Sequence, residues 1–251
     1  MEQRICAVAV APLRKEPAHR SEMVSQLLLG EMVTCQDTSG DFVFIQNRYD
    51  NYTGWCQKSQ LVSIEADEAI NHTEQLSAEF ISPASWNGWP MQVPLGAPVG
   101  NLLHRHFPGF IFNGTIHEAG SLPFVPQNIM AHISWYHQTP YAWGGKSVYG
   151  IDCSGFCQQV YRFFGKKLSR DASQQALEGE MVGFLEEVRC GDLAFFDNEE
   201  GKITHVGLLL SNKEIIHASG KVRVDDIDQW GILHRDTGQR THTLRLIRRY
   251  N

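Results

Sequence analysis

Prolines are concentrated in one section of this chain and limit what that section can fold into. Seven of the ten prolines lie between residues 75 and 126. Proline lacks a backbone N–H and clashes with the preceding helical turn, so this density excludes helices and central strands. Apolar runs such as Phe110-Ile111-Phe112 and the tryptophans Trp86 and Trp89 remain in the section. We therefore expect a second small β unit rather than a linker.

The section before the prolines, residues 1–64, alternates short β-prone runs with turn signals. The runs are Ile5 to Val10, Met32 to Cys35, Phe42 to Gln46 and Gly54 to Cys56. This spacing is typical of a small β-barrel. The apolar stretch from Ile5 to Leu13 is interpreted as a β-strand, because its apolar part is too short for a secretory signal. An acidic stretch at residues 65–68 separates this barrel from the proline-rich section.

After Pro126 the pattern changes to helices followed by strands. Helical spacing predicts a helix over 128–137 and a second one from Asp152, which Gly165 ends. The second helix has an apolar stripe of Phe156, Val160, Phe163 and Phe164 and a wet side of Gln158, Gln159 and Arg162. Strands at 193–196, 203–210 and 214–217 form an antiparallel meander. The sequence thus predicts an α+β domain over 127–251, preceded by domains at 1–64 and 75–126.

Composition excludes several classes of protein. The chain has 28 acidic and 22 basic residues and a net charge of −6, without the basic clusters that bind nucleic acid. No stretch approaches the ~20 apolar residues that span a membrane. The six cysteines contain no CxxC spacing, which favours reduced thiols and the cytoplasm. We expect a monomer that binds neither nucleic acid nor membranes.

One cysteine occupies a position suited to a nucleophile. In Asp152-Cys153-Ser154-Gly155, Cys153 falls in the first turn of a helix capped by Asp152. Free N–H groups and the helix dipole stabilise a thiolate there and can bind an oxyanion. A lowered thiol pKa and a catalytic role are therefore expected for Cys153, the alternative being a small buried thiol, which suits Cys157.

Two histidines are predicted to meet near this cysteine. His205 lies within a strand, and His217 lies on the next one. Pairing Leu210 with Glu214 across a three-residue loop places His217 opposite Gly207. The two histidine side chains then become diagonal neighbours on one face of the sheet. In a Cys, His, polar-residue arrangement, Cys153 attacks, His205 transfers the proton and His217 fixes the tautomer of His205.

Metal binding is not expected. Four other histidines lie outside any CxxC or HExxH spacing, namely His104, His106, His117 and His132. We expect neither a metal nor another cofactor.

Six short motifs together resemble the NlpC-type cell-wall cysteine peptidases. They are Tyr141-Ala142-Trp143-Gly144-Gly145, Asp152-Cys153-Ser154-Gly155-Phe156, Arg170-Asp171-Ala172-Ser173, Gly191-Asp192-Leu193, His205-Val206-Gly207 and Ile216-His217-Ala218. The match covers residues 127–251. The front half resembles the bacterial SH3-like domains of γ-D-glutamyl-L-diamino acid endopeptidases (dipeptidyl-peptidase VI). The resemblance implies a papain-like domain, with helices packed on an antiparallel sheet, after two SH3-like β-barrels.

The resemblance also implies substrate-binding residues. Tyr141 matches a tyrosine on the oxyanion side, and Asp152 and Ser154 match residues that flank the nucleophile. Glu22 and Tyr52 match an amine pocket supplied by the first SH3-like domain. For that position Tyr49 competes with Tyr52, and either tyrosine can instead pack in the barrel. Relatives often have serine at Ala172, so Ser173 is the neighbouring candidate.

The implied reaction is hydrolysis of the γ-D-glutamyl-diamino acid bond in murein peptides with a free N-terminal L-Ala. A carboxylate pair at Asp152 and Glu22 would select the free amine, because an unpaired buried charge is costly. We expect turnover of imported peptides in the cytoplasm, or a periplasmic or secreted enzyme if a signal peptide has been removed. The alternatives are hydrolysis of intact peptidoglycan, wall binding without catalysis, and acyl transfer by the same residues.

Overall fold

The computed structural model describes residues 2–65 and 74–250 and divides into two compact units. Unit 1 comprises Met1–Ser121 and Trp143–Tyr149, and unit 2 comprises Leu122–Ala142 and Gly150–Asn251. The acidic stretch expected to separate two domains lies, beyond Glu65, outside the described residues. No helix in the described ranges is long and apolar enough to cross a bilayer.

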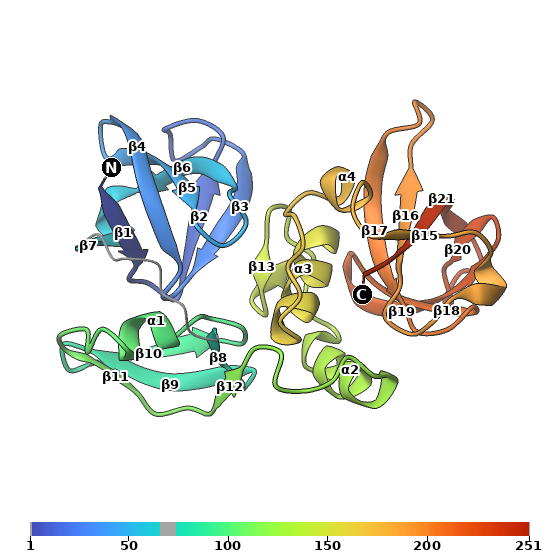
Figure 1. Ribbon diagram of the computed structural model, residues 1–251. Helices are drawn as coiled ribbons and strands as arrows, with labels where there is room; N and C mark the ends of the chain where they lie inside the picture. The colour runs from blue at the N-terminus through green and yellow to red at the C-terminus, as the bar shows by residue number, and fades with distance from the viewer. Residues whose placement is uncertain (1, 66–73, 251) are drawn as a thin grey trace. The chain divides into compact units, whose positions relative to one another are not determined.

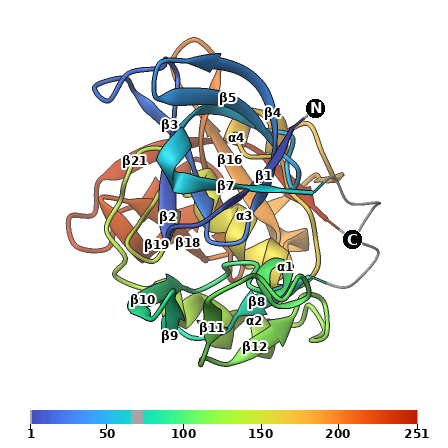
Figure 2. The ribbon, with the colours of Figure 1, turned by 90° about the vertical axis from the view of Figure 1, so that its left-hand side faces the viewer.

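Unit 1 begins with a seven-stranded antiparallel sheet, in the order β3-β2-β6-β5-β4-β1-β7 (Figure 1). Its elements are β1 (Gln3–Cys6), β2 (Val10–Arg14), β3 (Met23–Leu28), β4 (Met32–Ser39), β5 (Phe42–Asn47), β6 (Thr53–Gln57), the 3-10 turn Lys58–Gln60 and β7 (Leu61–Ile64). Figure 2 shows the paired strands β4 and β5 side by side. The sheet surrounds a cluster of fully buried apolar residues that includes Leu13, Leu27, Val33 and Ile45.

The stretch from Ile5 to Leu13, expected as one strand, forms two. The chain bends at Val8 and Ala9. Before the bend, β1 pairs with β4 and β7, and after it β2 pairs with β3 and β6. The single-strand prediction is wrong because the apolar run turns a corner of the sheet while both parts stay buried.

The proline-rich section of unit 1 consists of short strands and one turn of helix. Its elements are β8 (Gln75–Ser77), β9 (Ile81–Trp86), β10 (Trp89–Pro94), α1 (Gly100–Leu103), β11 (Phe110–Phe112) and β12 (Ile116–Glu118). They form the sheets β10-β9-β11 and β12-β8. Ile5 and Leu28 of the first sheet share a buried cluster with Ala84, Val93 and Leu102 of this section.

The sequence analysis expected neither helices nor central strands in the proline-rich section, and the structure corrects both expectations, since α1 is a short helix that starts two residues after Pro98. Pro83 lies within β9, the middle strand of its sheet, and faces Gln92 of β10. On the other side β11 pairs only with residues 84–86. Pro83 lies opposite Asn113, just past the end of β11, and its carbonyl oxygen accepts the Asn113 N–H at 3.0 Å, so the missing N–H removes one bond at the end of this pairing.

The segment Trp143–Tyr149, which carries β13 (Lys146–Ser147), belongs to unit 1. The Nζ atom of Lys146 lies 3.2 and 3.4 Å from the two carboxylate oxygens of Glu31 and 3.9 Å from Asp50, with all three side chains buried. Gly144 has φ +75°, and a Cβ atom there would lie 2.6 Å from the carbonyl oxygen of Met23. A buried ion pair and a required glycine therefore hold this segment in unit 1.

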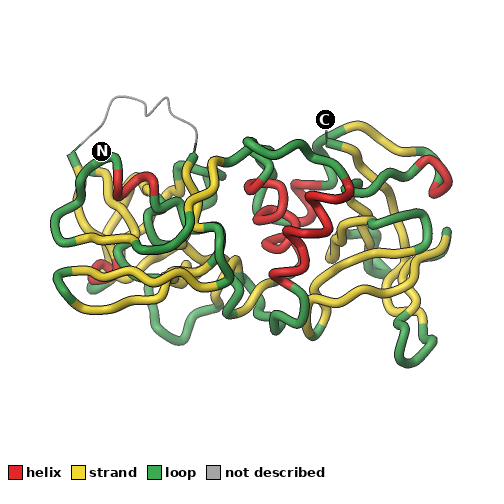
Figure 3. Tube along the Cα trace, turned by 90° about the horizontal axis from the view of Figure 1, so that it is seen from below, coloured by secondary structure: helices red, strands yellow, loops and turns green. Residues whose placement is uncertain are grey.

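Unit 2 contains the longest helix, α3, and most of the remaining strands. Its helices are α2 (Pro126–Ile133), α3 (Cys153–Phe163) and α4 (Ala172–Gln175), with 3-10 turns at Ser134–Tyr136 and Leu185–Glu187, and helices are red in Figure 3. The strands are β14 (Gly150–Ile151), β15 (Glu180–Val182), β16 (Leu193–Asp197), β17 (Ile203–Leu209), β18 (Glu214–Ser219), β19 (Lys221–Asp228), β20 (Gly231–Leu233) and β21 (Arg240–Arg249).

The main sheet of unit 2 has the order β15-β21-β16-β17-β18-β19-β20, and β21 also pairs with β20, which closes it into a barrel. Helix α3 contacts β17 and β18. The expected meander of β16, β17 and β18 is confirmed. The expected wet side of α3 is wrong, because Gln158, Gln159 and Arg162 are all buried. The side-chain amide of Gln158 donates to the carbonyl oxygen of Leu168, so the buried glutamine supplies a hydrogen-bond partner to a buried backbone group.

The buried pair in unit 1 gives a stability prediction. Replacing Lys146 by methionine leaves the Glu31 carboxylate buried without its cation, which should cost about 3–5 kcal/mol of unfolding free energy. Adding Glu31→Gln should restore most of the loss, because the amide keeps an acceptor for Asn47 while removing the charge. Urea unfolding of the two variants tests this, and an equal loss in both would contradict it.

Candidate active site

Cys153 is the first residue of α3, as the sequence predicts. Asp152 precedes the helix with extended backbone angles, and its Oδ1 atom accepts the Gly155 N–H at 2.7 Å. This is the geometry of an N-terminal cap. The backbone N–H groups of Ser154 and Val206 both donate toward the Cys153 sulfur. Since Val206 directly follows His205, the thiol lies beside the strand that carries the expected base.

The residues around the cap form a buried polar group. Arg170 donates from Nη1 and Nη2 to the two oxygens of Asp152, at 3.0 and 2.6 Å. Its Nη1 atom also donates to the Ser154 hydroxyl at 2.9 Å, and that hydroxyl lies 3.3 Å from Asp152 Oδ1. Arg170 stood in one of the quoted motifs but received no role. The structure assigns it a positioning contact, because a two-pronged guanidinium fixes the carboxylate that caps α3.

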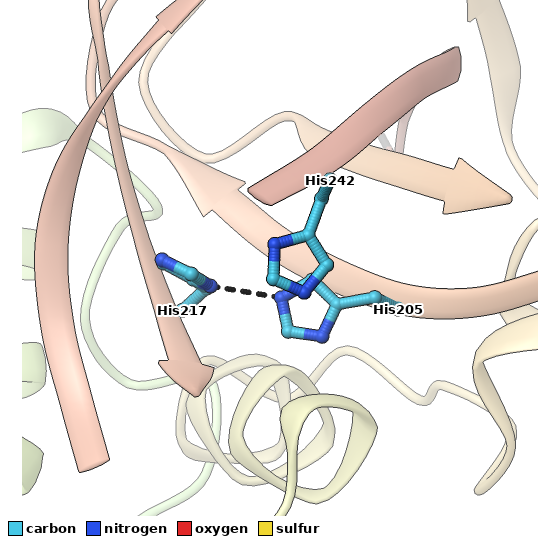
Figure 4. Close-up of side chains that lie close together, drawn as sticks. All are labelled: His205, His217 and His242. Atoms are coloured by element: carbon cyan, nitrogen blue, oxygen red, sulfur yellow. Dashed lines mark hydrogen bonds between the residues drawn. The ribbon is translucent and has the colours of Figure 1, made fainter. Parts of the chain in front are cut away.

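His205 and His217 meet as the register argument requires. Gly207 pairs with His217 across β17 and β18, which is the predicted register. The Nε2 atom of His205 lies 2.8 Å from Nδ1 of His217, and both rings are buried (Figure 4). A Cβ atom at Gly207 would lie 2.9 Å from the Cβ of His217, so glycine is needed opposite this ring. The prediction that the two histidines share a face is confirmed.

Sequence reasoning missed the carboxylate behind them. Asp225 of β19 lies 3.0 Å from Nε2 of His217 and accepts hydrogen bonds from Nε and Nη2 of Arg223, both at 2.8 Å. The Arg235 N–H also donates to it. The tight turn at Gly220 could have predicted this contact. A turn there pairs Ser219 with Lys221, which places residue 225 diagonal to His217 on the same face of the sheet.

A third histidine, His242, also escaped the sequence analysis. Its ring stacks on that of His205 with centroids 4.1 Å apart and planes 24° apart, as Figure 4 shows. His242 lies on β21, which reaches β17 only through β16 and the closure of the barrel. No local pattern in the sequence predicts such a contact between strands that are far apart in the chain.

Burial keeps the resting site neutral. Burial, followed by the charge of Asp152, raises the pKa of Cys153 to about 12. Burial, with the neighbouring His242 and His217, holds the pKa of His205 well below its usual 6.5. The helix terminus was expected to lower the thiol pKa, but removal from water outweighs it here. Both shifts favour the uncharged thiol and the uncharged imidazole in the substrate-free protein.

The remaining expected site residues differ in their surroundings. Tyr141 forms a β-bridge with Ile151, the residue directly before the cap Asp152. Burial, together with Cys153 and Asp152, raises the pKa of Tyr141 to about 12. Ser173 is exposed on α4. In unit 1, Glu22 is exposed and accepts the Trp143 Nε1–H at 2.9 Å, whereas Tyr52 packs against the barrel core. Their roles in substrate binding stay predictions.

The four histidines considered for a metal do not gather. In the ranges that the structure describes, the His, Cys, Asp and Glu side chains close enough to share an ion are His205, His217 and His242. His132 instead stacks on Phe163 with ring centroids 3.7 Å apart.

The neutral state of His205 can be tested by titration. We expect its NMR titration midpoint well below 6.5, so that the ring is uncharged at pH 7 and gains a proton only on acidification. The same ring in the urea-unfolded chain should titrate near 6.5. A folded-state midpoint at or above 6.5 would instead indicate an imidazolium paired with a thiolate.

Comparison with known proteins identifies both parts of the chain. Residues 138–241 match the NlpC/P60 family, and residues 13–61 match the bacterial dipeptidyl-peptidase SH3 domain. A crystal structure of an NlpC/P60 family protein from Bacillus cereus superposes with a TM-score of 0.82 over 99% of both chains at 19% identity, which supports the fold.

Two curated relatives extend the match over most of the chain. The gamma-D-glutamyl-L-lysine dipeptidyl-peptidase of Bacillus subtilis is 44% identical over 218 residues, covering 77% of this chain and 71% of the relative. Dipeptidyl-peptidase 6 of Lysinibacillus sphaericus is 26% identical over 270 residues, covering 92% and 94%. On the strength of these matches the chain belongs to the NlpC/P60 family.

Proposed function

We propose that this protein is a cysteine peptidase that hydrolyses the γ-D-glutamyl-diamino acid bond of murein-derived peptides with a free N-terminal L-Ala. The observation that carries the proposal is the buried line of Asp225, His217 and His205, which ends beside a cysteine at the start of a helix. The name of the relative at 44% identity supports the bond and the class of substrate.

The line of hydrogen bonds fixes which nitrogen of His205 acts. An ionised carboxylate can only accept hydrogen bonds, so Nε2 of His217 carries the ring proton and donates it in a hydrogen bond to Asp225. In the neutral ring Nδ1 of His217 is then an acceptor, and Nε2 of His205 must donate to it. This leaves the lone pair on Nδ1 of His205, the ring nitrogen that does not bond to His217. His205 is thereby held in the tautomer that accepts the thiol proton.

The chemical steps follow from this arrangement. The Cys153 sulfur attacks the γ-carbonyl carbon of D-glutamate while His205 Nδ1 takes the thiol proton. The oxygen that becomes negative is bound by the backbone N–H of Cys153 at the start of α3, because the Gly155 N–H already donates to Asp152. The C–N bond then breaks, and the imidazolium returns the proton to the departing amine. Water, deprotonated by the same nitrogen, cleaves the thioester and restores the thiol.

Selection of a free amine is part of the proposal. An α-ammonium removed from water requires anionic partners, and Asp152 and Glu22 are the carboxylates assigned to it. Asp152 is buried beside the nucleophile, with its charge offset by Arg170. Glu22 is exposed, so it is open to a ligand. The remaining proposed substrate-binding residues are Tyr141, Ser154, Ser173 and either Tyr52 or Tyr49.

The finer assignments of fold and setting belong to the same proposal. We propose three domains, at 1–64, 75–126 and 127–251, of which the second is also SH3-like. In the last domain the helices pack on the sheet. The protein is proposed to be a cytoplasmic monomer.

Two peptides test the proposed reaction. The protein should release L-Ala-γ-D-Glu from L-Ala-γ-D-Glu-L-Lys and leave the N-acetylated twin uncut. Cys153→Ala should abolish release, while Cys157→Ala, four residues further on the same helix and fully buried, should retain it. Liquid chromatography of the products measures both. Release by Cys153→Ala would remove the nucleophile, and equal cleavage of the acetylated peptide would remove the amine specificity.

Asp225→Asn tests the positioning role of the carboxylate. An amide NH₂ donates to Nε2 of His217, which reverses the hydrogen bonds and puts the ring proton of His205 on Nδ1. We expect kcat to fall by about 10-fold or more with KM unchanged, less than the ~10⁴-fold loss found where a carboxylate bonds the catalytic histidine directly. The neighbouring, exposed Asp226→Asn is the matched control. A normal kcat in folded Asp225→Asn would contradict the role.

A further inference from the structure

Three imidazoles from three different strands come together in unit 2. His205 of β17, His217 of β18 and His242 of β21 each offer a ring nitrogen, and these atoms all lie within 4.8 Å of one another (Figure 4). The proposed reaction uses His205 and His217 but gives His242 no proton to carry. We call the three residues the histidine cluster.

The ring of His217 is prepared as a metal ligand. Its Nε2 atom bonds to Asp225, so Nδ1 faces the cluster with its lone pair. Metal-binding histidines commonly have this carboxylate behind them, because it fixes the ring orientation and raises the basicity of the ligand nitrogen. In His242, Nδ1 lies 2.9 Å from the Thr241 hydroxyl, and Nε2 is the other ring nitrogen.

The nitrogen separations are close to those around a shared ion, but the rings must turn to bind it, because the stacked planes of His205 and His242 do not direct their lone pairs to one point. Tetrahedral Zn²⁺ with Zn–N bonds of about 2.0–2.1 Å needs ligand nitrogens about 3.3 Å apart. His205 Nε2 and His217 Nδ1 are 2.8 Å apart and would separate slightly. His242 is half-buried and stacked on His205, so its ring would turn about its own side-chain bonds to aim a nitrogen between the other two.

We propose that the histidine cluster is an inhibitory site for a divalent transition metal such as Zn²⁺. Three imidazoles suit Zn²⁺, Cu²⁺ or Ni²⁺ and do not suit Mg²⁺ or Ca²⁺, which prefer oxygen ligands. A metal on Nε2 of His205 replaces the hydrogen bond to His217, and the proton of the neutral ring moves to Nδ1. Nδ1 then cannot accept the thiol proton of Cys153. The inhibitory effect rests on the proposed function, whereas metal binding does not.

Metal binding is measured first, without activity. Untagged, full-length Cys153→Ala, which removes the nearby thiol, is titrated with Zn²⁺ by calorimetry and with Co²⁺ by its visible absorption. One ion per chain with a tetrahedral Co²⁺ spectrum is expected. Adding His242→Phe keeps an aromatic ring against His205 but removes the ligand, and should weaken binding by about 10-fold or more. His137→Phe, an exposed histidine of the same unit, should change nothing.

Inhibition is measured second, on the wild-type chain. Zn²⁺ should stop peptide hydrolysis, a chelator should restore it, and Mg²⁺ should have no effect. His242→Phe should need about 10-fold or more Zn²⁺ for half inhibition of its own zinc-free rate.

Each outcome decides one statement. Absence of binding in Cys153→Ala overturns the site, and binding that is unchanged by His242→Phe overturns its assignment to the histidine cluster. Binding without inhibition overturns the withdrawal of the base. A chain that binds metal but cleaves no peptide, even when metal-free, refutes the proposed function and leaves the metal site standing.

Discussion

The chemistry of this protein depends on the pairing register of three adjacent strands. Gly207 faces His217 across β17 and β18, and His217 faces Arg223 across β18 and β19. Together these pairings align Asp225, His217 and His205 in one hydrogen-bonded line. A slip of one residue in either pair would move a ring or the carboxylate to the opposite face of the sheet. Gly207 protects the register, because any larger residue would collide with His217 and Ile215.

The sequence predicts what local patterns control. A cap residue followed by a helical stripe locates Cys153 at the start of α3, and a loop of odd length places His205 and His217 on one face. It does not predict what barrel closure brings together. His242 reaches His205 only because β21 returns beside β16, and the burial of Gln159 follows from its surroundings rather than its polarity. Asp225 falls between these cases, because the turn at Gly220 is a local pattern that predicts its position beside His217, although the sequence analysis drew no conclusion from it.

The division into units shows the same limit. The motif Tyr141-Ala142-Trp143-Gly144-Gly145 reads as one turn in the sequence, yet the boundary between the two units passes between Ala142 and Trp143. Trp143 and Lys146 are held in unit 1 by Glu22 and Glu31, partners more than a hundred residues earlier in the chain. An exposed indole hydrogen bond, a buried ion pair and the close approach of Gly144 to Met23 together hold the segment, and no periodicity in the sequence encodes contacts over that separation.

Burial and the hydrogen-bonded line act on the site in different ways. Burial raises the pKa of the Cys153 thiol and lowers that of His205, which favours the uncharged form of both. The carboxylate of Asp225 contacts His217 and Arg223. Through its hydrogen bond to His217, Asp225 favours a single tautomer of His205. In the proposed reaction, charge separation between Cys153 and His205 must therefore be stabilised as the substrate reacts, because burial alone disfavours it.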